Sequence, residues 1–550
     1  MSEQSPAVHD FDAVIVGAGF SGLYALYRLR ERGLRVLVIE AGDGAGGTWY
    51  WNRYPGARTD SQSEVYQYWF SDELLNEWDG AERFPPQAET ERYLNFVADK
   101  FALRKDIRFG TRVTAAHWNE AGGCWQVTTD RGDRLSTQFF LMCTGGLSTP
   151  VFPPFPGRED FAGELYHTAQ WPRTPVEFAG KRVGVIGTAA TGIQVIQTIA
   201  ARVGSLTVFQ RTPNYTIPMR NPKYDDATRS AIRARYPELR ERVHGTFAGF
   251  ETDFQPKAFA ELSDTERTRI LEALWADGSL NFWIGAFREV FTDQAARDFI
   301  SEFVRNKIRA RVRDPRVAEK LVPKTYGFGT RRVPLETKYY EAFNRDNVTL
   351  VDLNETPIER ITARGVQTSA GEIELDMLIF ATGFDAGTGA LTGVDIRGRS
   401  GESLKELWSR GLRTTLGMQV HGYPNLFMTM APMSPAAAFC NVPTCSQQQV
   451  DSIPDTIDHD RQHGRAIELL EAYKTAVFRP ERFEEFARLA SEVFARVRLA
   501  PERLAEALTY LEGSQIRPEP RTGMFCGALI NRSWGAAQDY AAQRVTTMLF

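Results

Sequence analysis

The sequence predicts an α/β fold that consists of two Rossmann-like dinucleotide-binding domains with a helical insert. The main observation is that a strand, a glycine-containing turn, a helix and a second strand follow one another twice along the 550 residues. A second observation is a run of charged, amphipathic segments between residues 225 and 313, which has the period of helices. The length agrees, because at roughly 150 residues per domain the chain holds about two to four structural units.

The first of the two repeated units begins at residues 11–19, an apolar stretch that ends in glycines, as expected of a buried parallel strand. Residues 21–32 carry apolar side chains at helical spacing, and residues 35–40 form a second apolar strand. The turn before the helix has the pattern GxGxxG. Its first glycine permits the turn, the second lets the backbone approach a pyrophosphate, and the third packs the helix on the strand. The predicted cofactor contacts of this turn are Gly17, Gly19, Phe20 and Gly22.

The residue at the end of the second strand indicates which dinucleotide this unit binds. Glu40 is placed to accept hydrogen bonds from a ribose diol, whereas its charge would repel a 2′-phosphate. The first unit is therefore predicted to bind FAD or NAD.

The second unit repeats this order, with a strand over 181–187, a helix over 191–202 and a strand near 206–210. Its turn, GTAATG, lacks the middle glycine and is a poorer match to the pattern. Arg211 stands where the first unit has its glutamate, and an arginine can bind a 2′-phosphate through two hydrogen bonds. The second unit is therefore predicted to bind NADPH. The alternative is that Arg211 is only a solvated charge at a strand end.

The remaining segments suggest domain boundaries. An FAD-binding domain is expected over residues 1–150 and again over 380–550, the latter with a substrate and lid region. The NADPH-binding domain is expected over 151–224 and 326–379, separated by a helical insert over 225–325.

Local patterns support these boundaries. In the insert, Ile300, Val304 and Ile308 step by four, and Ser263 with Glu266 has the form of a capping box.

Two short strands are expected after the insert, over 348–351 and 375–380, and charged helical sequence is expected over 480–511. The strand over 375–380 is followed by Thr382 and Gly383, which are expected to lie against the FAD.

Composition excludes several classes of protein. The net charge of -4 gives no global field for nucleic acid or an anionic membrane, and no apolar run approaches the length of a spanning helix. The N-terminus lacks the order of a signal peptide, so a cytoplasmic protein is expected. The five cysteines show no CxxC spacing, which predicts reduced thiols and no zinc site. No protein partner is evident, and either a monomer or a homo-oligomer is compatible with the sequence.

These features together resemble the class B flavoprotein monooxygenases, and three stretches resemble the type I Baeyer–Villiger monooxygenases among them. Residues 161–172, FAGELYHTAQWP, fit the family pattern FxGxxxHxxxW followed by Pro or Asp. Residues 46–60, GGTWYWNRYPGARTD, and 328–334, FGTRRVP, look like two further family motifs. The resemblance covers approximately residues 11 to 450.

The resemblance implies an enzyme that uses FAD, NADPH and O2 to insert one oxygen atom next to a ketone carbonyl, through a flavin C4a-peroxide, giving an ester or lactone. It implies that Arg332 contacts the flavin peroxide and that Asp60 orients this arginine. Arg331, where the family usually has Lys, is implied to bind the NADPH 2′-phosphate together with Arg211. His167 and Trp171 are implied to lie in a hinge rather than at the chemistry.

Catalytic roles are predicted for Arg332 and Asp60. The remaining predicted cofactor contacts are Gly47, Thr48, Trp49, Tyr66, Gly187, Thr188, Thr191, Gly192, Gln194, Arg211, Arg331, Thr382 and Gly383, with Glu40 and the first turn. No metal ligands are predicted, because the histidines lack ligand spacing.

A loop near residue 435 is expected to set substrate size. Its alanines leave space and its larger side chains offer apolar contact, which favours a cyclic or bulky apolar ketone. The residues concerned are Met433, Ala436, Ala437, Ala438 and Phe439.

Three other functions stay open from the sequence. One is a class B enzyme that oxygenates nitrogen or sulfur, another is an NADPH-dependent flavin reductase or oxidase, and the third is a catalytically silent nucleotide-binding regulator.

Overall fold

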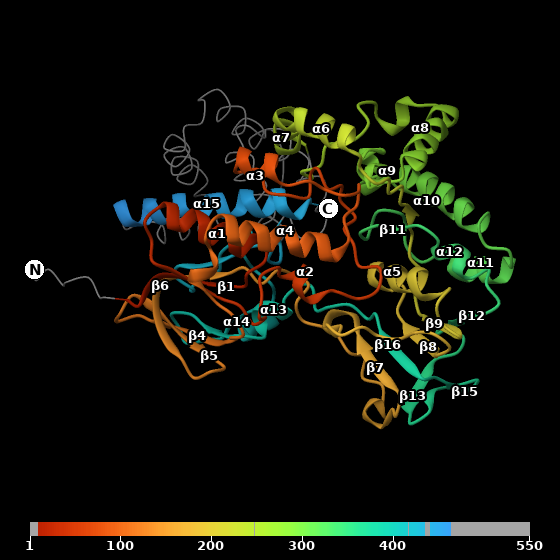
Figure 1. Ribbon diagram of the computed structural model, residues 1–550, viewed down its shortest axis with the longest axis horizontal. Helices are drawn as coiled ribbons and strands as arrows, with labels where there is room; N and C mark the ends of the chain where they lie inside the picture. The colour runs from red at the N-terminus through yellow and green to blue at the C-terminus, as the bar shows by residue number, and fades with distance from the viewer. Residues whose placement is uncertain (1–8, 247, 416, 435–439, 464–550) are drawn as a thin grey trace, which may run out of the picture.

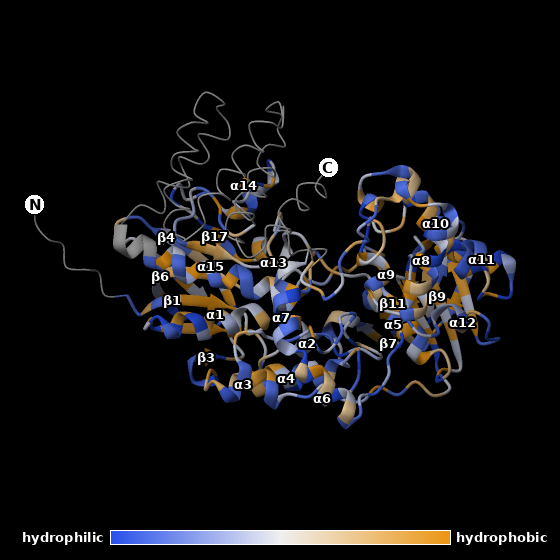
Figure 2. Ribbon diagram, turned by 90° about the horizontal axis from the view of Figure 1, so that it is seen from above, coloured by the Kyte–Doolittle hydropathy of each residue, from blue (hydrophilic) through white to orange (hydrophobic). Residues whose placement is uncertain are grey.

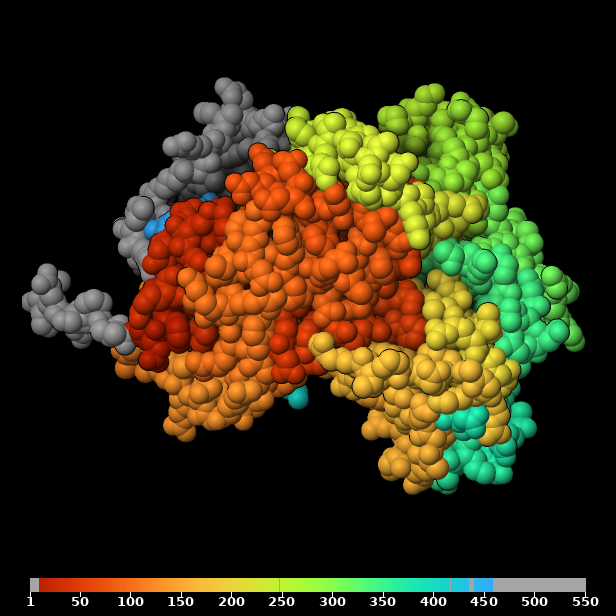
Figure 3. Space-filling model, viewed as in Figure 1, coloured from red at the N-terminus to blue at the C-terminus, as the bar shows by residue number. Residues whose placement is uncertain are grey.

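The computed structural model describes residues 9–246, 248–415, 417–434 and 440–463. It contains two α/β units and a group of helices inserted in the second unit (Figure 1). In Figure 3 the surface of the first unit, red to orange, meets the second unit and the insert, gold to green, along the middle of the molecule. The predicted fold class is therefore confirmed.

The first unit is built on an eight-stranded sheet with the order β17-β4-β5-β6-β1-β2-β3, in which β18 also pairs with β6. The β1–β2 and β1–β6 pairs are parallel, whereas β4, β5 and β6 form an antiparallel meander. The strands are β1 (Phe11–Val16), β2 (Val36–Ile39), β3 (Ile107–Arg108), β4 (Val113–Asn119), β5 (Cys124–Thr129), β6 (Arg134–Met142), β17 (Asp395–Arg397) and β18 (Leu426–Met428).

Helices cover this sheet, and α1, α4 and α15 lie on the same side of it (Figure 1). Helix α1 packs on α15 although about 420 residues separate them, and Tyr24 Oη donates to Asp451 Oδ1 at 2.7 Å. The helices are α1 (Phe20–Glu31), α2 (Thr48–Trp51), α3 (Asp72–Glu77), α4 (Gln87–Lys100), α13 (Gly389–Thr392), α14 (Leu404–Ser409) and α15 (Val442–His463).

The second unit is built on a five-stranded sheet with the order β12-β9-β8-β16-β7, in which every pair is parallel. Its strands are β7 (Glu164–His167), β8 (Arg182–Ile186), β9 (Ser205–Gln210), β12 (Val348–Asp352) and β16 (Met377–Phe380). Around it lie α5 (Ala190–Ile199), α12 (Tyr339–Ala342), the pair β10 (Ile217–Pro218) and β11 (Leu335–Glu336), and the small sheet β13 (Ile358–Thr362), β14 (Gly365–Thr368) and β15 (Gly371–Glu374). Such an all-parallel sheet is buried on both faces, and Figure 2 shows the strands of both units coloured mainly as hydrophobic.

The insert is helical, as predicted. It consists of α6 (Asp226–Ala234), α7 (Tyr236–Gly245), α8 (Asp264–Asp277), α9 (Asn281–Ile284), α10 (Gln294–Arg309) and α11 (Pro315–Leu321). The three side chains that step by four on α10 are fully buried, and the capping box at Ser263 and Glu266 begins α8.

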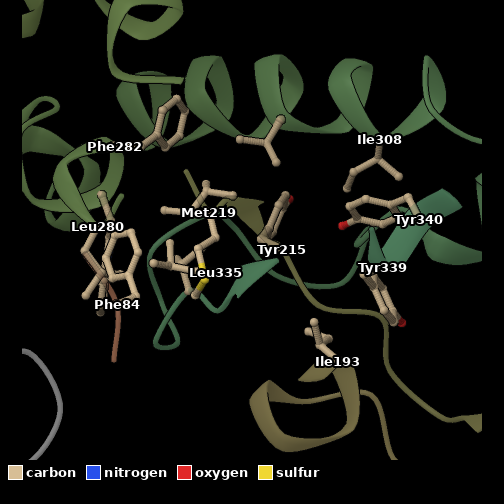
Figure 4. Close-up of a cluster of buried hydrophobic side chains, with 14 of the residues drawn as sticks. Phe84, Ile193, Tyr215, Met219, Leu280, Phe282, Ile308, Leu335, Tyr339 and Tyr340 are labelled. Carbon is tan, nitrogen blue, oxygen red and sulfur yellow. The ribbon is translucent and has the colours of Figure 1, made fainter. Parts of the chain in front are cut away.

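The insert shares one hydrophobic core with the second unit. Figure 4 shows Phe282 and Leu280 of the insert beside Tyr215 and Leu335 of the second unit, with Phe84 of the first unit at the edge. The insert therefore cannot shift freely against the second unit, because the two bury the same apolar surface.

The strand expected near 375–380 is β16 of the second sheet, between β8 and β7, and contact of the residues after it with FAD is untested. One expectation needs correction. The expectation of reduced thiols is wrong for Cys440 and Cys445, which form a disulfide. Their Cα atoms are 6.4 Å apart, within the range that a disulfide spans.

Some expectations are not tested by this structure. The charged helical sequence expected over 480–511 lies outside the described residues. Among the residues that are described, we find no helix with the length and apolar character to cross a membrane.

The third glycine of the first turn gives a test of this packing. A Cβ on Gly22 would lie 1.8 Å from the Gly17 carbonyl oxygen, so Gly22→Ala should force β1 and α1 apart and cost about 1–3 kcal/mol. Thermal unfolding should show a lower midpoint for this variant. Gly245→Ala is the matched control, because no atom lies within 4 Å of its added Cβ, and it should unfold at or above the wild-type temperature. An unchanged midpoint for Gly22→Ala would contradict the argument.

Candidate active site

Each glycine of the first turn lies close to the backbone of another segment. Gly17 has φ +101°, and a Cβ there would lie 2.7 Å from the Cys143 carbonyl oxygen. Gly19 packs on Gly47 of the second motif, since a Cβ on Gly47 would lie 2.8 Å from the Gly19 Cα. The bare backbone at the start of α1 leaves the amide groups of the helix end accessible to a pyrophosphate, so the turn fits the dinucleotide predicted for it.

Glu40 has a role in the protein that the sequence did not reveal. Its Oε2 accepts from Ala18 N and its Oε1 accepts from Gly42 N, both at 2.7 Å, so the carboxylate holds the glycine turn to the loop that follows β2. Burial raises the pKa of this carboxyl, and the two backbone hydrogen bonds oppose that rise. Each oxygen can accept a second hydrogen bond, so binding of a ribose stays a prediction for Glu40.

The second turn has nearly the same backbone as the first. Gly187 has φ +109°, and a Cβ on Gly192 would lie 2.2 Å from the Gly187 carbonyl oxygen. Ala189, where the first turn has Gly19, has φ -84° and ψ -170°, against -89° and -163° for Gly19. Any residue can adopt these angles, and Ala189 is exposed, so the missing glycine does not change the turn. The weaker match to the pattern therefore does not count against a second dinucleotide site.

The second turn is joined to neighbouring strand ends. Thr188 Oγ1 donates to the Thr212 carbonyl oxygen at 3.1 Å, which fixes the turn to the segment after β9. A Cβ on Gly187 would lie 2.4 Å from the Ala381 carbonyl oxygen, so Thr382 and Gly383 follow β16 beside the second turn. Their predicted contact with a cofactor is untested, and their place is at the second unit rather than at the first turn.

The predicted catalytic pair is brought together from segments 272 residues apart. Arg332 Nε donates to Asp60 Oδ2 at 2.6 Å and Arg332 Nη2 donates to Asp60 Oδ1 at 2.7 Å. Burial by itself would lower the pKa of Arg332, but the charge and the hydrogen bonds of Asp60 raise it above its ordinary value. The Arg332 side chain is 34% exposed, so the guanidinium stays accessible while it is held in one orientation.

An aromatic group connects this ion pair to the first glycine turn. Trp49 Nε1 donates to Tyr66 Oη at 3.2 Å, and the Tyr66 ring meets the ring of Phe20 edge-on at 5.4 Å. Burial and the charge of Asp60 raise the pKa of Tyr66, while Arg332 lowers it, so the hydroxyl lies within the field of both charges. The three aromatic residues, all predicted cofactor contacts, thus form one group between the turn and the ion pair. Thr48, the first residue of α2, is exposed beside them.

A contact between the two units was missed by the sequence analysis. Tyr54 Oη donates to Gln194 Oε1 at 2.9 Å, and Gln194 Nε2 donates to the Arg58 carbonyl oxygen at 3.2 Å. Burial raises the pKa of Tyr54 to about 12, the hydroxyl of Thr191 lowers it and Asp60 raises it. The Gln194 side chain therefore binds the first unit, and its contact with NADPH stays a prediction. The signal was present, because Tyr54 lies inside the motif over 46–60, but its tyrosine was given no role.

Tyr326 connects one of the two cations predicted for a 2′-phosphate to the segment that follows the other. Arg211 directly follows β9, and the Arg331 guanidinium carbon lies 4.4 Å from the centre of the Tyr326 ring. Tyr326 Oη lies 2.9 Å from the carbonyl oxygen of Pro213 and 2.8 Å from Asn214 Oδ1, both just beyond Arg211.

The predicted hinge residues are buried and structural in their contacts. His167 Nδ1 accepts from Ala169 N at 3.1 Å, and His167 Nε2 lies 3.3 Å from the Val151 carbonyl oxygen. Trp171 packs beside Tyr166 with ring centres 5.0 Å apart. Burial lowers the pKa of His167, so the imidazole is neutral near pH 7.

The substrate loop is only partly within the described residues. Met433 is 43% exposed and has φ +64°. Ala436, Ala437, Ala438 and Phe439 lie outside the described residues, so the expectation about substrate size is untested. Among the residues described, no group of side chains has the composition to hold a metal ion.

The chain is similar in sequence and in fold to several known proteins. The model of the family described as flavin-binding monooxygenase-like matches residues 12–219. An acetone monooxygenase (methyl acetate-forming) of Gordonia sp. (strain TY-5) is 50% identical over 83% of this chain and 86% of that protein. A Baeyer–Villiger monooxygenase of Pseudooceanicola batsensis is 43% identical over 83% of each. The crystal structure of OTEMO in complex with FAD and NADP matches with a TM-score of 0.81 at 41% identity, over 83% of this chain and 87% of that one.

The buried imidazole gives a test by pH. Because the pKa of His167 in the folded protein lies below its ordinary value of about 6.5, the unfolded chain takes up a proton at a higher pH than the folded protein. The stability that neutral His167 contributes is thus lost as the pH falls below about 6.5. Thermal unfolding between pH 8 and pH 5 should show a steeper loss on acidification for the wild type than for His167→Asn. Parallel curves for the two proteins would contradict the burial argument.

Proposed function

Since the chain belongs to the flavin-binding monooxygenase-like family and, within it, to the Baeyer–Villiger monooxygenases, we propose that it converts ketones to esters or lactones with NADPH and O2. Its cofactors are FAD and NADPH, and the OTEMO structure that it matches holds FAD and NADP. The observation that carries the proposal is the ion pair of Asp60 and Arg332, which lies beside the aromatic group of the first glycine turn.

The two glycine turns support a separate site for each cofactor. We place FAD at the first turn, where Glu40 suits a ribose diol, and NADPH at the second, where Arg211 and Arg331 suit a 2′-phosphate. The close approach of Gly19 and Gly47 would be lost with any side chain, so the first turn fits a bound pyrophosphate.

When bound, FAD supplies the activated oxygen that is derived from O2, after reduction by NADPH. The protein would supply a fixed positive charge at this site, Arg332. Arg332 cannot lose its proton at any working pH, so it can stabilise the negative charge that develops on the ketone oxygen as the carbonyl is attacked. Asp60 keeps the guanidinium in one plane through two hydrogen bonds, which removes the need to reorient it during the reaction.

The proposal is tested with the FAD-loaded protein, NADPH and O2, and a panel from acetone to cyclopentanone and larger apolar ketones. Mass spectrometry should detect the ester or lactone that carries one added oxygen atom. If NADPH consumption yields only hydrogen peroxide with every ketone, while an amine or a thioether is oxygenated, the proposal is wrong and a nitrogen- or sulfur-oxygenating enzyme takes its place. The panel also tests the expected preference for cyclic or bulky ketones.

Arg332 can be tested separately from cofactor binding. Arg332→Ala should retain FAD and still be reduced by NADPH, but ester formation should fall on the order of a hundredfold or more, because the fixed charge is lost. Arg332→Lys keeps the charge without the two parallel hydrogen bonds and should lie between the two proteins. The rates of flavin reduction and of ester formation are the two measurements. Wild-type ester formation by Arg332→Ala would remove this residue from the mechanism.

A further inference from the structure

The two consecutive arginines of the FGTRRVP stretch point to different units. Arg332 pairs with Asp60 of the first unit, whereas Arg331 stacks on Tyr326 at 4.4 Å. The loop that carries them is held by the core, because Phe328 is fully buried and packs edge-on against Tyr215 with ring centres 5.6 Å apart. The direction of each arginine is therefore set by the fold of the loop.

Tyr326 is itself tightly held. Its hydroxyl proton has two acceptors in reach, the Pro213 carbonyl oxygen and Asn214 Oδ1, and its own carbonyl oxygen accepts from Tyr215 Oη at 3.2 Å. The rings of Tyr215 and Tyr326 meet edge-on at 5.4 Å, and Figure 4 shows Tyr215 within the core of the second unit. Burial raises the pKa of Tyr326 to about 12, although the charge of Arg331 lowers it, so the hydroxyl remains a donor at neutral pH.

These contacts place the ring at the edge of the second dinucleotide site. The segment that anchors Tyr326 starts at Arg211, directly after β9, and Thr188 of the glycine turn donates to Thr212 in the same segment. Strands β8 and β9 are parallel, so their carboxyl ends and the start of α5 lie at one edge of the sheet, where a dinucleotide binds.

A stacked guanidinium has a defined orientation. Contact with the ring restricts the positions that the guanidinium can take, and its N–H groups that do not face the ring remain available to a phosphate. An arginine without such a contact would lose more rotamer entropy in reaching the same geometry. Stacking removes part of this cost before the ligand arrives.

We propose that Tyr326 is a positioning residue that orients Arg331 for the 2′-phosphate of NADPH, and so sets the preference of this enzyme for NADPH over NADH. The inference rests on the proposed function, in which the second turn binds NADPH with Arg211 and Arg331. It assigns a role to a tyrosine that lies just outside the FGTRRVP stretch.

The test compares kcat/KM for NADPH and for NADH in the FAD-loaded enzyme. Tyr326→Leu removes the ring and should lower the NADPH to NADH ratio about two- to fivefold, the equivalent of ~0.5–1 kcal/mol for an exposed cation–π contact. The change should lie in KM for NADPH, with kcat and all NADH parameters near wild type. The affinity for 2′,5′-ADP, measured by titration, should fall while that for AMP stays constant, which gives a readout independent of turnover.

Three further variants make the result specific. In an Arg331→Ala background, Tyr326→Leu should have no additional effect on the ratio, because both changes remove the same contact. Tyr326→Phe keeps the ring and should retain most of the preference. Phe259→Leu removes the ring 3.8 Å from the guanidinium of Arg267 in the insert, away from the site, and should leave the ratio unchanged.

The outcomes separate the two proposals. If Arg331→Ala lowers the ratio but Tyr326→Leu does not, or if Tyr326→Leu lowers kcat/KM for NADPH and NADH equally, the inference about Tyr326 is wrong and the function stands. If Arg331→Ala leaves the ratio unchanged, the assignment of Arg331 to the 2′-phosphate fails, and the inference fails with it. Should Tyr326→Leu not fold, Tyr326→Met removes the ring with a side chain that adapts to irregular space, and the same ratios decide.

Discussion

The bidentate ion pair between Asp60 and Arg332 is the interaction on which the arrangement of the site depends. The carboxylate comes from the first unit and the guanidinium from the loop after the insert, so the pair can form only when both units and the insert are in place. An arginine held in this way keeps its charge and its orientation without a ligand. The insert contributes by packing against the loop that carries Arg332, since Phe328 of this loop is buried among insert and second-unit side chains.

A second set of contacts maintains the distance between the two dinucleotide turns. Tyr54 and the Arg58 carbonyl oxygen bind the two ends of the Gln194 amide on α5, and a Cβ on Gly56 would lie 2.7 Å from the Gln194 carbonyl oxygen. The start of α5 is therefore pressed against the segment that carries Asp60. These hydrogen bonds add to the apolar contacts between the units, because Val65, Trp69 and Phe84 of the first unit belong to the buried core of the second unit and the insert.

Sequence patterns within short segments predicted the helices and turns better than the contacts between distant segments. Both glycine turns, the helices that follow them and the buried stripe on α10 were predicted, because each depends on residues close in sequence. The strand over 375–380 was predicted, but its place between β8 and β7 was not, since an apolar strand fits any buried position in a parallel sheet. The disulfide was missed because its five-residue separation follows no known spacing, and only the fold brings the two Cα atoms to 6.4 Å.

The sequence by itself determined the two dinucleotide units, the helical insert within the second unit and the types of residue at the site, because these follow from glycine placement, helical period and charge at strand ends. Only the tertiary structure decided how those residues are used. It pairs Arg332 with a carboxylate 272 residues away and places Arg331 over the ring of Tyr326. It also makes the Glu40 carboxylate accept a hydrogen bond from the backbone of the first turn. The physical reason is that orientation and pairing depend on which surfaces pack together, and packing joins segments that no local pattern relates.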